Sequence, residues 1–528
     1  MYSYIAKSLL AGNGRVPNFV GCFIGQSWQA VNVIAPPFSK FNLTFMAKEL
    51  QYAHHPLTLF DGMFHSAGVV AGWFVEGLLD LRKVDHALSR LVTKWPMLAG
   101  RLERTGKKLG LTVRVPLGPL PPTYVSYSLT SKLSNKPITD YVKLPLPVSS
   151  GVLPAHLFLN PTAPQNPHHW SDKDIPLTYW HLTYFKAQGL EYTCIGVTFS
   201  HGLLDGMGIA AVIHALEAES LGRPWSIPPS LEPGINGNKM QSLLDKTRDQ
   251  MEEEGIPLPA DYRATSVVGW WFFIMFLWWH IWQQFWHKAQ RRMILMPPQV
   301  YEKLVRDSRE AMKREGKTDV RLSTGDVIAA WIYKTIYSQE TSPSRLVQLS
   351  NMASLRMFSD ASLNHYPHNC FIPIGYPIFT IAQLKTIRLH HLAYELAKAK
   401  SGLSLGHAVH VYKLLEESTK PSRFHKSVMP YDARADETLV MSNMSIARVV
   451  DINWTGLGGK RTVCRYKANL CQSSVLISNV VTITGRLHDG STVLDVILNR
   501  KRRQLLEMEL EKLIVDAKAE SDSLSSKC

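Results

Sequence analysis

The sequence predicts an α/β protein that is built from two halves of similar length. The chain has 528 residues, and because a single hydrophobic core rarely grows beyond about 250–300 residues, two domains are expected. Hydrophobic residues make up 45% of the chain and charged residues 19%, which is typical of soluble globular proteins. Strand-like and helix-like segments alternate on both sides of a proline-rich stretch near the middle, so each half is expected to be α/β.

The first half is predicted to contain two helices, a strand and a hairpin. Residues Lys83–Trp95 place apolar side chains at i, i+3 and i+4, which predicts a helix with one buried face that the next proline ends. Met97–Leu102 is predicted to be a short strand. The runs Leu177–Phe185 and Tyr192–Phe199 flank a Gln-Gly turn and predict a β-hairpin. The small apolar residues of Met207–Ala218 predict a buried helix.

Prolines mark the boundary between the two halves. Four prolines lie between residues 224 and 233, a charged helix is predicted over Met240–Glu254, and two more prolines follow. Such a cluster is typical of a connection between domains. We therefore divide the chain into an N-terminal half at residues 1–225, a crossover at 226–300 and a C-terminal half at 301–528.

The second half repeats the alternation of strands and helices. Ser323 is a suitable N-cap for a helix that extends to Tyr337. The remaining predictions are strands at Leu346–Arg356, Asn369–Ile378, Val480–Leu487 and Thr492–Leu498, and helices at Thr380–Ser401, Gly406–Ser418 and Asn499–Ala517.

His201 is the strongest candidate for a catalytic residue. The apolar run Val197–Phe199 leads into Ser200 and His201, and Asp205 and Gly206 follow just before the predicted helix. A histidine at the end of a strand can face a pocket while the strand fixes its position. Its ordinary pKa of about 6.5 leaves it mostly neutral at pH 7, which suits a general base.

The spacing His-x-x-x-Asp carries little weight alone, because it also occurs at His168 and Asp172. That second pair lies in a loop rich in proline and asparagine, with no predicted strand before it and no predicted helix after it. Spacing alone fits a buried structural histidine at position 201 equally well. The strand-to-helix context is what favours His201 over His168.

Five segments occur in the same order as in the BAHD family of acyl-CoA-dependent acyltransferases, which they resemble. His201–Gly206 resembles the H-x-x-x-D-G signature of that family. The other four are Trp95–Leu102, Leu322–Trp331, Arg356 with Tyr366 and Asn369, and Ser442–Met444 followed by Asp451–Gly456. The resemblance covers about residues 57–515. The last segment keeps only the Asp, the Trp and one Gly of the family's D-F-G-W-G box, so the chain is similar to a divergent fungal branch that includes the trichothecene acetyltransferases.

The resemblance implies a fold of two chloramphenicol-acetyltransferase-like α/β halves with a central channel. It implies that His201 takes the proton of an acceptor as that group attacks the thioester of an acyl-CoA, without an acyl-enzyme. Asp205 is implied to point away from the pocket and pair with an arginine, Asp451 to be structural as well, and Arg356 is a candidate partner. The residues expected to support the site structurally are Asp205, Gly206, Arg356, Asp451 and Trp454.

Under this interpretation the enzyme is an O-acyltransferase that uses an acyl-CoA, in the simplest case acetyl-CoA. Its acceptor is the hydroxyl of an apolar secondary metabolite such as a terpenoid or polyketide. Ser323 and Thr324 are candidates for the CoA side of the channel, although Ser323 fits a plain helix cap equally well. No bound cofactor and no metal are expected, since none of the six cysteines has the C-x-x-C spacing of a zinc ribbon. We expect a monomer.

The distribution of the charges and the motifs argue against two other functions, nucleic-acid binding and hydrolysis. The net charge is +15, which attracts polyanions. The lysines and arginines are dispersed, however, and no basic-aromatic motif occurs, so we expect no nucleic-acid partner. A hydrolase is disfavoured because the G-x-S-x-G elbow is missing. Two alternatives stay open, namely acyl transfer to an amine and a catalytically inactive binding module of the same fold.

Residues Val267–Trp286 form an apolar segment inside the crossover. They hold six of the 14 tryptophans, and Lys288, Arg291 and Arg292 follow. A spanning helix needs about 20 apolar residues, and tryptophan favours the headgroup level. We therefore expect peripheral membrane contact rather than a buried helix or a span. Met1–Pro17 shows no secretory pattern, so we expect a cytoplasmic protein at the cytosolic face of the endoplasmic reticulum membrane.

Overall fold

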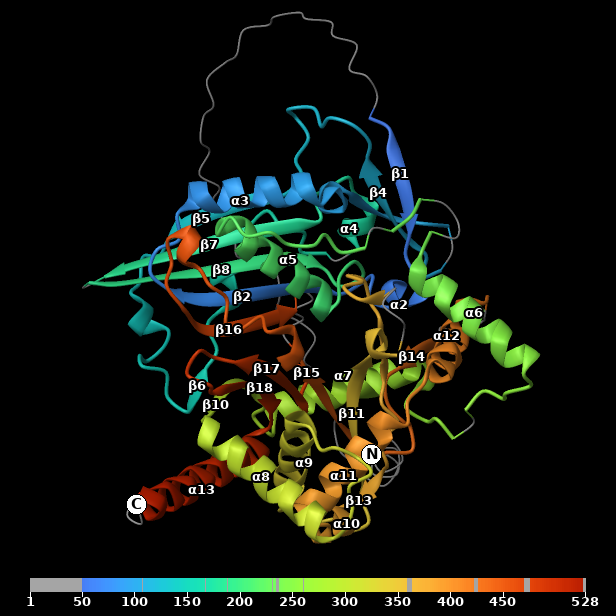
Figure 1. Ribbon diagram of the computed structural model, residues 1–528, viewed down its shortest axis with the longest axis vertical. Helices are drawn as coiled ribbons and strands as arrows, with labels where there is room; N and C mark the ends of the chain where they lie inside the picture. The colour runs from blue at the N-terminus through green and yellow to red at the C-terminus, as the bar shows by residue number, and fades with distance from the viewer. Residues whose placement is uncertain are drawn as a thin grey trace, which may run out of the picture.

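The computed structural model describes residues 50–525 except 107, 167, 188, 230, 234–236, 260, 359–362, 422–425 and 470–474. The expectation for Met1–Pro17 therefore lies outside the described residues. Two sheets with their helices form an upper and a lower layer in Figure 1. Each layer has its own hydrophobic core.

The upper layer is built on a five-stranded sheet in the order β16-β2-β8-β7-β5. Its strands are β2 (Gly68–Glu76), β5 (Ser128–Leu133), β7 (Thr178–Ala187), β8 (Leu190–Ser200) and β16 (Thr462–Asn469). The helices α3 (Leu81–Lys94) and α5 (Gly206–Ser220) pack beside it (Figure 1). The predicted hairpin is confirmed as β7 and β8, and the two predicted helices are confirmed as α3 and α5.

Short elements surround this sheet. A three-stranded sheet contains β1 (Tyr52–Pro56), β4 (Leu111–Pro116) and β3 (Arg101–Arg104), and two short helices are α2 (Leu59–Gly62) and α4 (His169–Asp172). The predicted strand over Met97–Leu102 is wrong in its first half. Pro96 fixes the backbone for a 3₁₀ turn over Pro96–Ala99, so the strand begins only at Arg101.

The lower layer is built on an eight-stranded sheet in the order β12-β11-β15-β17-β18-β10-β6, with β13 beside β11. Its strands are β6 (Ser149–Gly151), β10 (Gln290–Met296), β11 (Leu346–Ser354), β12 (Phe371–Pro373), β13 (Phe379–Thr380), β15 (Glu437–Asn443), β17 (Val480–Arg486) and β18 (Thr492–Leu498). Its helices are α8 (Pro298–Arg314), α9 (Thr324–Tyr337), α10 (Ile381–Thr386), α11 (Leu389–Ser401), α12 (Leu405–Thr419) and α13 (Arg500–Ser525). The helix predicted over Thr380–Ser401 is two helices, because the chain is extended at Ile387 and Arg388.

Each sheet takes one strand from the other half of the chain. β16 pairs with β2 in the upper sheet, and β6 pairs with β10 in the lower sheet. The two layers are thus joined by strand hydrogen bonds as well as by the crossover. The division at residues 225 and 300 remains a prediction, since sheet membership does not follow it.

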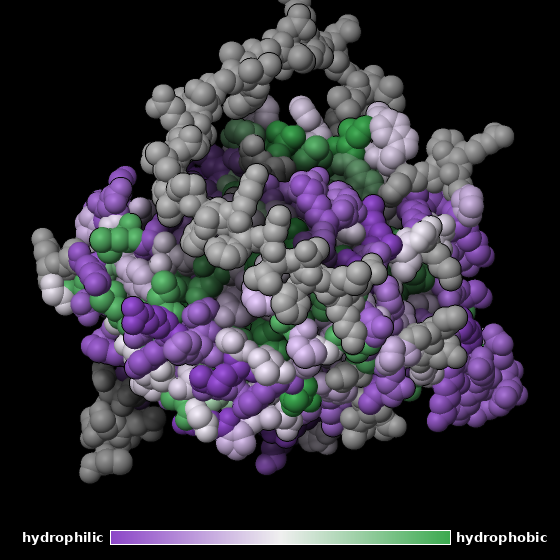
Figure 2. Space-filling model, turned by 90° about the horizontal axis from the view of Figure 1, so that it is seen from above, coloured by the Kyte–Doolittle hydropathy of each residue, from purple (hydrophilic) through white to green (hydrophobic). Residues whose placement is uncertain are grey.

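The crossover contains α6 (Lys239–Glu253) and the apolar helix α7 (Trp270–Phe285), which follows β9 (Ser266–Gly269). β9 pairs with β14 (Lys426–Met429). Of the α7 side chains only Trp279, His280 and Gln283 are buried, so α7 is not a core helix. In the part of the chain that the structure describes, no helix is long and apolar enough to cross a membrane. Seen from the end that carries α3, hydrophobic residues are scattered over a largely hydrophilic surface (Figure 2).

Candidate active site

His201 lies in the turn directly after β8, and both layers hold its backbone. Its N–H donates to the carbonyl of Ala67, at 2.7 Å, just before β2. Its own carbonyl accepts a hydrogen bond from the side-chain amide of Asn369, at 2.8 Å. A loop of the lower layer therefore fixes a residue of the upper layer, which positions His201 where the two layers meet.

The His201 ring is stacked between aromatic neighbours. The Phe64 ring lies parallel to it with centroids 4.4 Å apart, and Phe371 approaches edge-on at 6.4 Å. Burial, together with the nearby cation of Lys467, lowers the pKa of His201 to about 4. The imidazole is therefore neutral at pH 7 and can accept a proton.

Asp205 faces away from this chemistry because both of its oxygens are already bound. It is the N-cap of α5 and accepts hydrogen bonds from the backbone N–H groups of Met207 and Gly208, both at 2.9 Å. The Arg356 guanidinium donates to both oxygens, at 2.9 and 3.1 Å. The arginine pairing implied for Asp205 is present, and Arg356 is the partner.

Arg356 connects this ion pair to the loop that holds His201. Its guanidinium also donates to the carbonyl of Tyr366 and, at 2.9 Å, to the carbonyl of His368. Asn369 is the next residue, and its amide reaches His201. The Asp205–Arg356 pair thus orders the loop from 366 to 369 and, through it, the backbone of His201.

Asp61 is a residue of the site that sequence reasoning missed. It is fully buried in the short helix α2, and it accepts four hydrogen bonds, two from Thr58 and two from Asn369, at 2.8–2.9 Å. Burial raises its pKa to about 7, against the effect of these hydrogen bonds. The pattern Thr58-x-x-Asp61 indicates a helix cap, but nothing local indicates that Asn369, 308 residues later, completes it.

Two other predicted support residues pack near the site or beneath it. A Cβ at Gly206 would lie 2.3 Å from the end of the Met444 side chain, so Gly206 lets that side chain reach the start of α5. Trp454 is buried, and its indole N–H donates to the Thr462 hydroxyl at 2.9 Å. Trp454 thus anchors the start of β16.

Asp451 is not part of this arrangement. Its side chain is exposed, and within the described residues it forms neither an ion pair nor a hydrogen bond. The structural role expected for Asp451, with Arg356 as its candidate partner, finds no support, because Arg356 is occupied by Asp205.

Ser323 is the N-cap of α9, as the sequence predicted. Its hydroxyl forms a capping box with Asp326, whose carboxylate also pairs with Lys400 at 2.5 Å. A cap hydroxyl that is already bound to a carboxylate contacts a ligand less readily. The CoA contact expected for Ser323 and Thr324 remains a prediction.

A cavity of about 530 Å³ lies between the two sheets. Val70 and Gly72 of β2 and Lys467 of β16 line one wall, and Arg291 and Arg292 of β10 line the opposite wall. Gly68, two residues before Val70, pairs with Ser200, the residue before His201. At about 3.3 Å per strand residue, the cavity therefore begins roughly 7 Å along β2 from the His201 turn.

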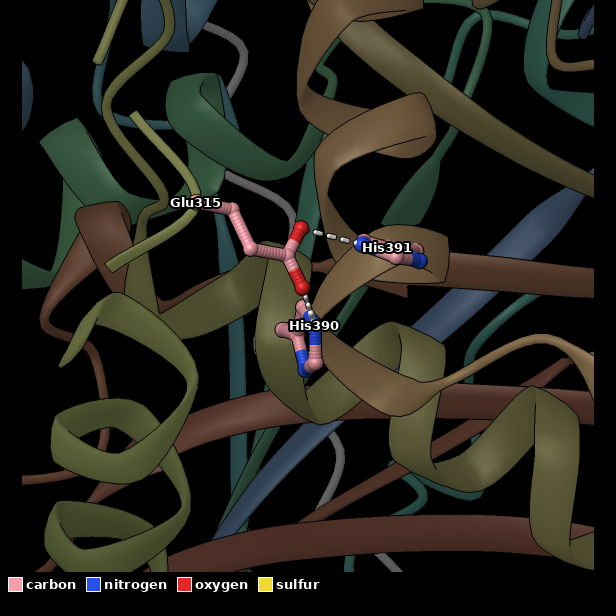
Figure 3. Close-up of side chains that lie close together, drawn as sticks. All are labelled: Glu315, His390 and His391. Atoms are coloured by element: carbon pink, nitrogen blue, oxygen red, sulfur yellow. Dashed lines mark hydrogen bonds and ion pairs between the residues drawn. The ribbon is translucent and has the colours of Figure 1, made fainter. Parts of the chain in front are cut away.

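A second cluster of titratable groups lies elsewhere in the lower layer. Glu315, at the end of α8, bonds to His390 at 3.0 Å and to His391 at 2.5 Å, and the three side chains converge in Figure 3. Their ligand atoms lie within 4.8 Å of one another, close enough to hold a metal ion. The Arg388 guanidinium is 3.5 Å from the same carboxylate, so the charge of Glu315 is balanced by the protein itself.

The chain is similar in sequence to known fungal proteins. No protein-family model matches the chain. The O-acyltransferase pboC of Aspergillus ustus is 26% identical over 268 residues, which are 50% of this chain and 53% of that protein. The acetyltransferase sphE of Aspergillus fumigatus is 21% identical over 434 residues, which are 76% of this chain and 81% of that protein. The chain thus spans about half the length of pboC and most of sphE.

Solved structures share the whole architecture. TRI101 of F. graminearum, in complex with coenzyme A and deoxynivalenol, matches with a TM-score of 0.61 at 14% identity over 87% of this chain and 98% of that chain. TRI101 of F. sporotrichioides, in complex with coenzyme A and T-2, matches with a TM-score of 0.55 over the same shares. The predicted fold class is therefore confirmed: the chain has the α/β fold of TRI101 and is similar in sequence to fungal proteins named O-acyltransferase and acetyltransferase.

Proposed function

We propose that this protein is an acyl-CoA-dependent O-acyltransferase in which His201 is the general base. The acceptor O–H gives its proton to His201 as its oxygen attacks the thioester carbonyl. The tetrahedral intermediate then collapses, the C–S bond breaks, and the CoA thiolate takes the proton from His201. The observation that carries this proposal is a buried, neutral His201 whose turn lies roughly 7 Å along β2 from the cavity between the two layers, in a fold whose solved examples include complexes with coenzyme A.

The substrates follow from the same resemblance. We propose acetyl-CoA as the donor and a hydroxyl of an apolar secondary metabolite, such as a terpenoid or polyketide, as the acceptor. The similar proteins named acetyltransferases, and the toxin bound to TRI101, support this choice. CoA is a co-substrate in this scheme, and the protein acts as a cytoplasmic monomer.

Acyl transfer can be tested without knowing the acceptor. Purified protein is incubated with radiolabelled acetyl-CoA and an apolar extract of the source organism, and labelled products are separated by chromatography. We expect a labelled product from the wild type and none from His201→Ala, while His168→Ala acts as the matched control with full activity. Equal loss in both variants would refute the role of His201.

The two alternatives give different products. An O-acyl ester is cleaved by hydroxylamine at alkaline pH, whereas an amide from an N-acyltransferase is stable under the same treatment. A catalytically inactive module would bind coenzyme A without forming any labelled product. The same labelled sample therefore separates the three functions.

We also propose that α7 rests on the cytosolic surface of a membrane, such as that of the endoplasmic reticulum. Its exposed apolar side chains are Trp270, Trp271, Phe273, Ile274, Leu277, Trp278, Trp282 and Phe285, with Trp286 directly after it. From Tyr262 to Tyr301 the chain has no acidic residue. Tryptophans and basic residues together favour the headgroup region of anionic lipid.

Flotation with vesicles tests this contact. We expect the protein to float with vesicles that contain phosphatidylserine and to lose this property when Trp270, Trp271 and Trp278 are changed to Ser. Leu133→Ser with Leu190→Ser, two exposed apolar positions on another face, is the control and should still float. Equal flotation of the triple variant and the wild type would contradict the proposal.

A further inference from the structure

The central cavity lies between two strands that carry four cationic side chains. Arg291 and Arg292 of β10 and Lys467 of β16 line the cavity directly, and Arg465 lies two residues before Lys467 on the same strand. The strands belong to different sheets, so the cations approach the cavity from both layers.

One carboxylate balances these four charges in the described part of the chain. Asp495 of β18 pairs with Arg291, whose Nε lies 2.8 Å from its Oδ1. Arg292 and Lys467 have no ion pair among the described residues. Arg465 is 5% exposed, its Nε donates no hydrogen bond to a described residue, and its guanidinium lies 5.7 Å from the Trp73 ring centroid. Three cations therefore lie in or beside the cavity without a carboxylate of their own.

An unpaired buried cation is costly because it has lost its water without gaining a counter-charge. The cost is visible in the acid–base properties of two of these groups. Burial, together with the neighbouring cation of Arg465, lowers the pKa of Lys467 to about 8. Burial also lowers the pKa of Arg465 to about 10. An anion bound in the cavity would supply the missing counter-charge and so offset the free-energy cost of desolvation.

We propose that the cavity binds an anionic oxygen group of a substrate, held by Lys467 and Arg292. The inference rests on the proposed function only for the identity of that substrate. Because the cavity begins so close to the His201 turn, a carboxylate on the acceptor fits better than the phosphates of acyl-CoA, which the long pantetheine arm separates from the thioester. The favoured acceptor is then amphiphilic, with an apolar skeleton and one acidic group.

Equilibrium binding of defined probes tests the site without turnover. The probes are decanoate, decanol and coenzyme A, measured by titration calorimetry on the full chain at pH 7. We expect decanoate to bind more tightly than decanol, and Lys467→Met and Arg292→Gln each to weaken decanoate binding about tenfold. Lys186→Met, an exposed lysine on β7, is the control and should leave binding unchanged.

The results answer two questions, namely whether the cavity binds an anionic group and which substrate carries that group. If the two variants weaken the binding of coenzyme A instead, the anion site is supported and its ligand is a phosphate of the acyl donor. If both variants bind decanoate and coenzyme A as tightly as the wild type, and circular dichroism shows that both variants are folded, the proposal is overturned. Absence of acetyl transfer by the wild type would refute the proposed function and leave this binding result unchanged.

Discussion

The ion pair between Asp205 and Arg356 gives the sharpest test of how the site is built. In Asp205→Asn the amide oxygen can still accept the hydrogen bonds from Met207 and Gly208, so the cap of α5 is kept. The amide NH₂ group, however, faces the Arg356 guanidinium, and a donor then meets a donor. Asp205 is 3% exposed and the Arg356 side chain 10%, so the remaining cation is left buried without its counter-charge.

The expected magnitude follows from that burial. Breaking a buried pair by removing one partner costs about 3–5 kcal/mol of the free energy of unfolding. At roughly 2–4 °C per kcal/mol for a large domain, the Tm should fall by about 6–20 °C. Activity measured well below the lower Tm should fall only as far as the loop that holds the His201 backbone loses its order, because neither oxygen of Asp205 is available to His201 itself.

Thermal denaturation followed by circular dichroism measures this change in Asp205→Asn, Arg356→Gln and the double variant. The double variant should lose less stability than the sum of the two single losses, since the interaction is counted only once. Asp172→Asn, the carboxylate of the second His-x-x-x-Asp sequence, is exposed and should leave the Tm unchanged. A variant with the wild-type Tm and no activity would refute the reasoning and make Asp205 a participant in proton transfer.

Three further predictions follow from the same geometry. Because the neutral form of His201 is the active one and its pKa is about 4, kcat/KM should stay constant from pH 8 to pH 5 and fall below that, and a midpoint near 6.5 would contradict the desolvation argument. Lys467→Met removes a cation that disfavours the imidazolium, so the midpoint of the His201 titration, measured by NMR, should move to higher pH. Gly208→Ala should lower the Tm well below that of Gly206→Ala, because the added Cβ meets a backbone carbonyl at 1.9 Å at position 208 but a flexible methionine end at 206; similar Tm values in both variants would count against that packing.

The helices and hairpin that depend on local periodicity were predictable from the sequence. Periodicity located α3, α5 and α9, and Ser323 is the N-cap that the sequence indicated. The strand predictions were wrong where the backbone does not follow the pattern of apolar residues. Pro96 starts a 3₁₀ turn in an apolar run that otherwise looks like a strand, and the strand predicted over Asn369–Ile378 shrinks to Phe371–Pro373.

The candidate site was only partly predictable, for a different reason. His201 and Asp205 occur in one short segment between a predicted strand and a predicted helix, and this local context pointed to them where the spacing alone did not. Asp61 and Asn369 meet across 308 residues, and no local pattern reports such a pairing. Lys467 reached the cavity because β16 inserts beside β2, a strand order that the sequence does not indicate.

The insertion of β16 beside β2 has a consequence for how the chain is made. β2 lies between β16 and β8, and its partner Thr462–Asn469 leaves the ribosome almost 400 residues after Gly68. Until then the outer edge of β2, with its run of Val69, Val70 and Ala71, has unpaired backbone groups. Pairing over such a sequence separation is slow to form. The upper layer is therefore completed only after residue 469 has been made, and a chain that stops before residue 462 would expose an unpaired strand edge that can pair with other chains.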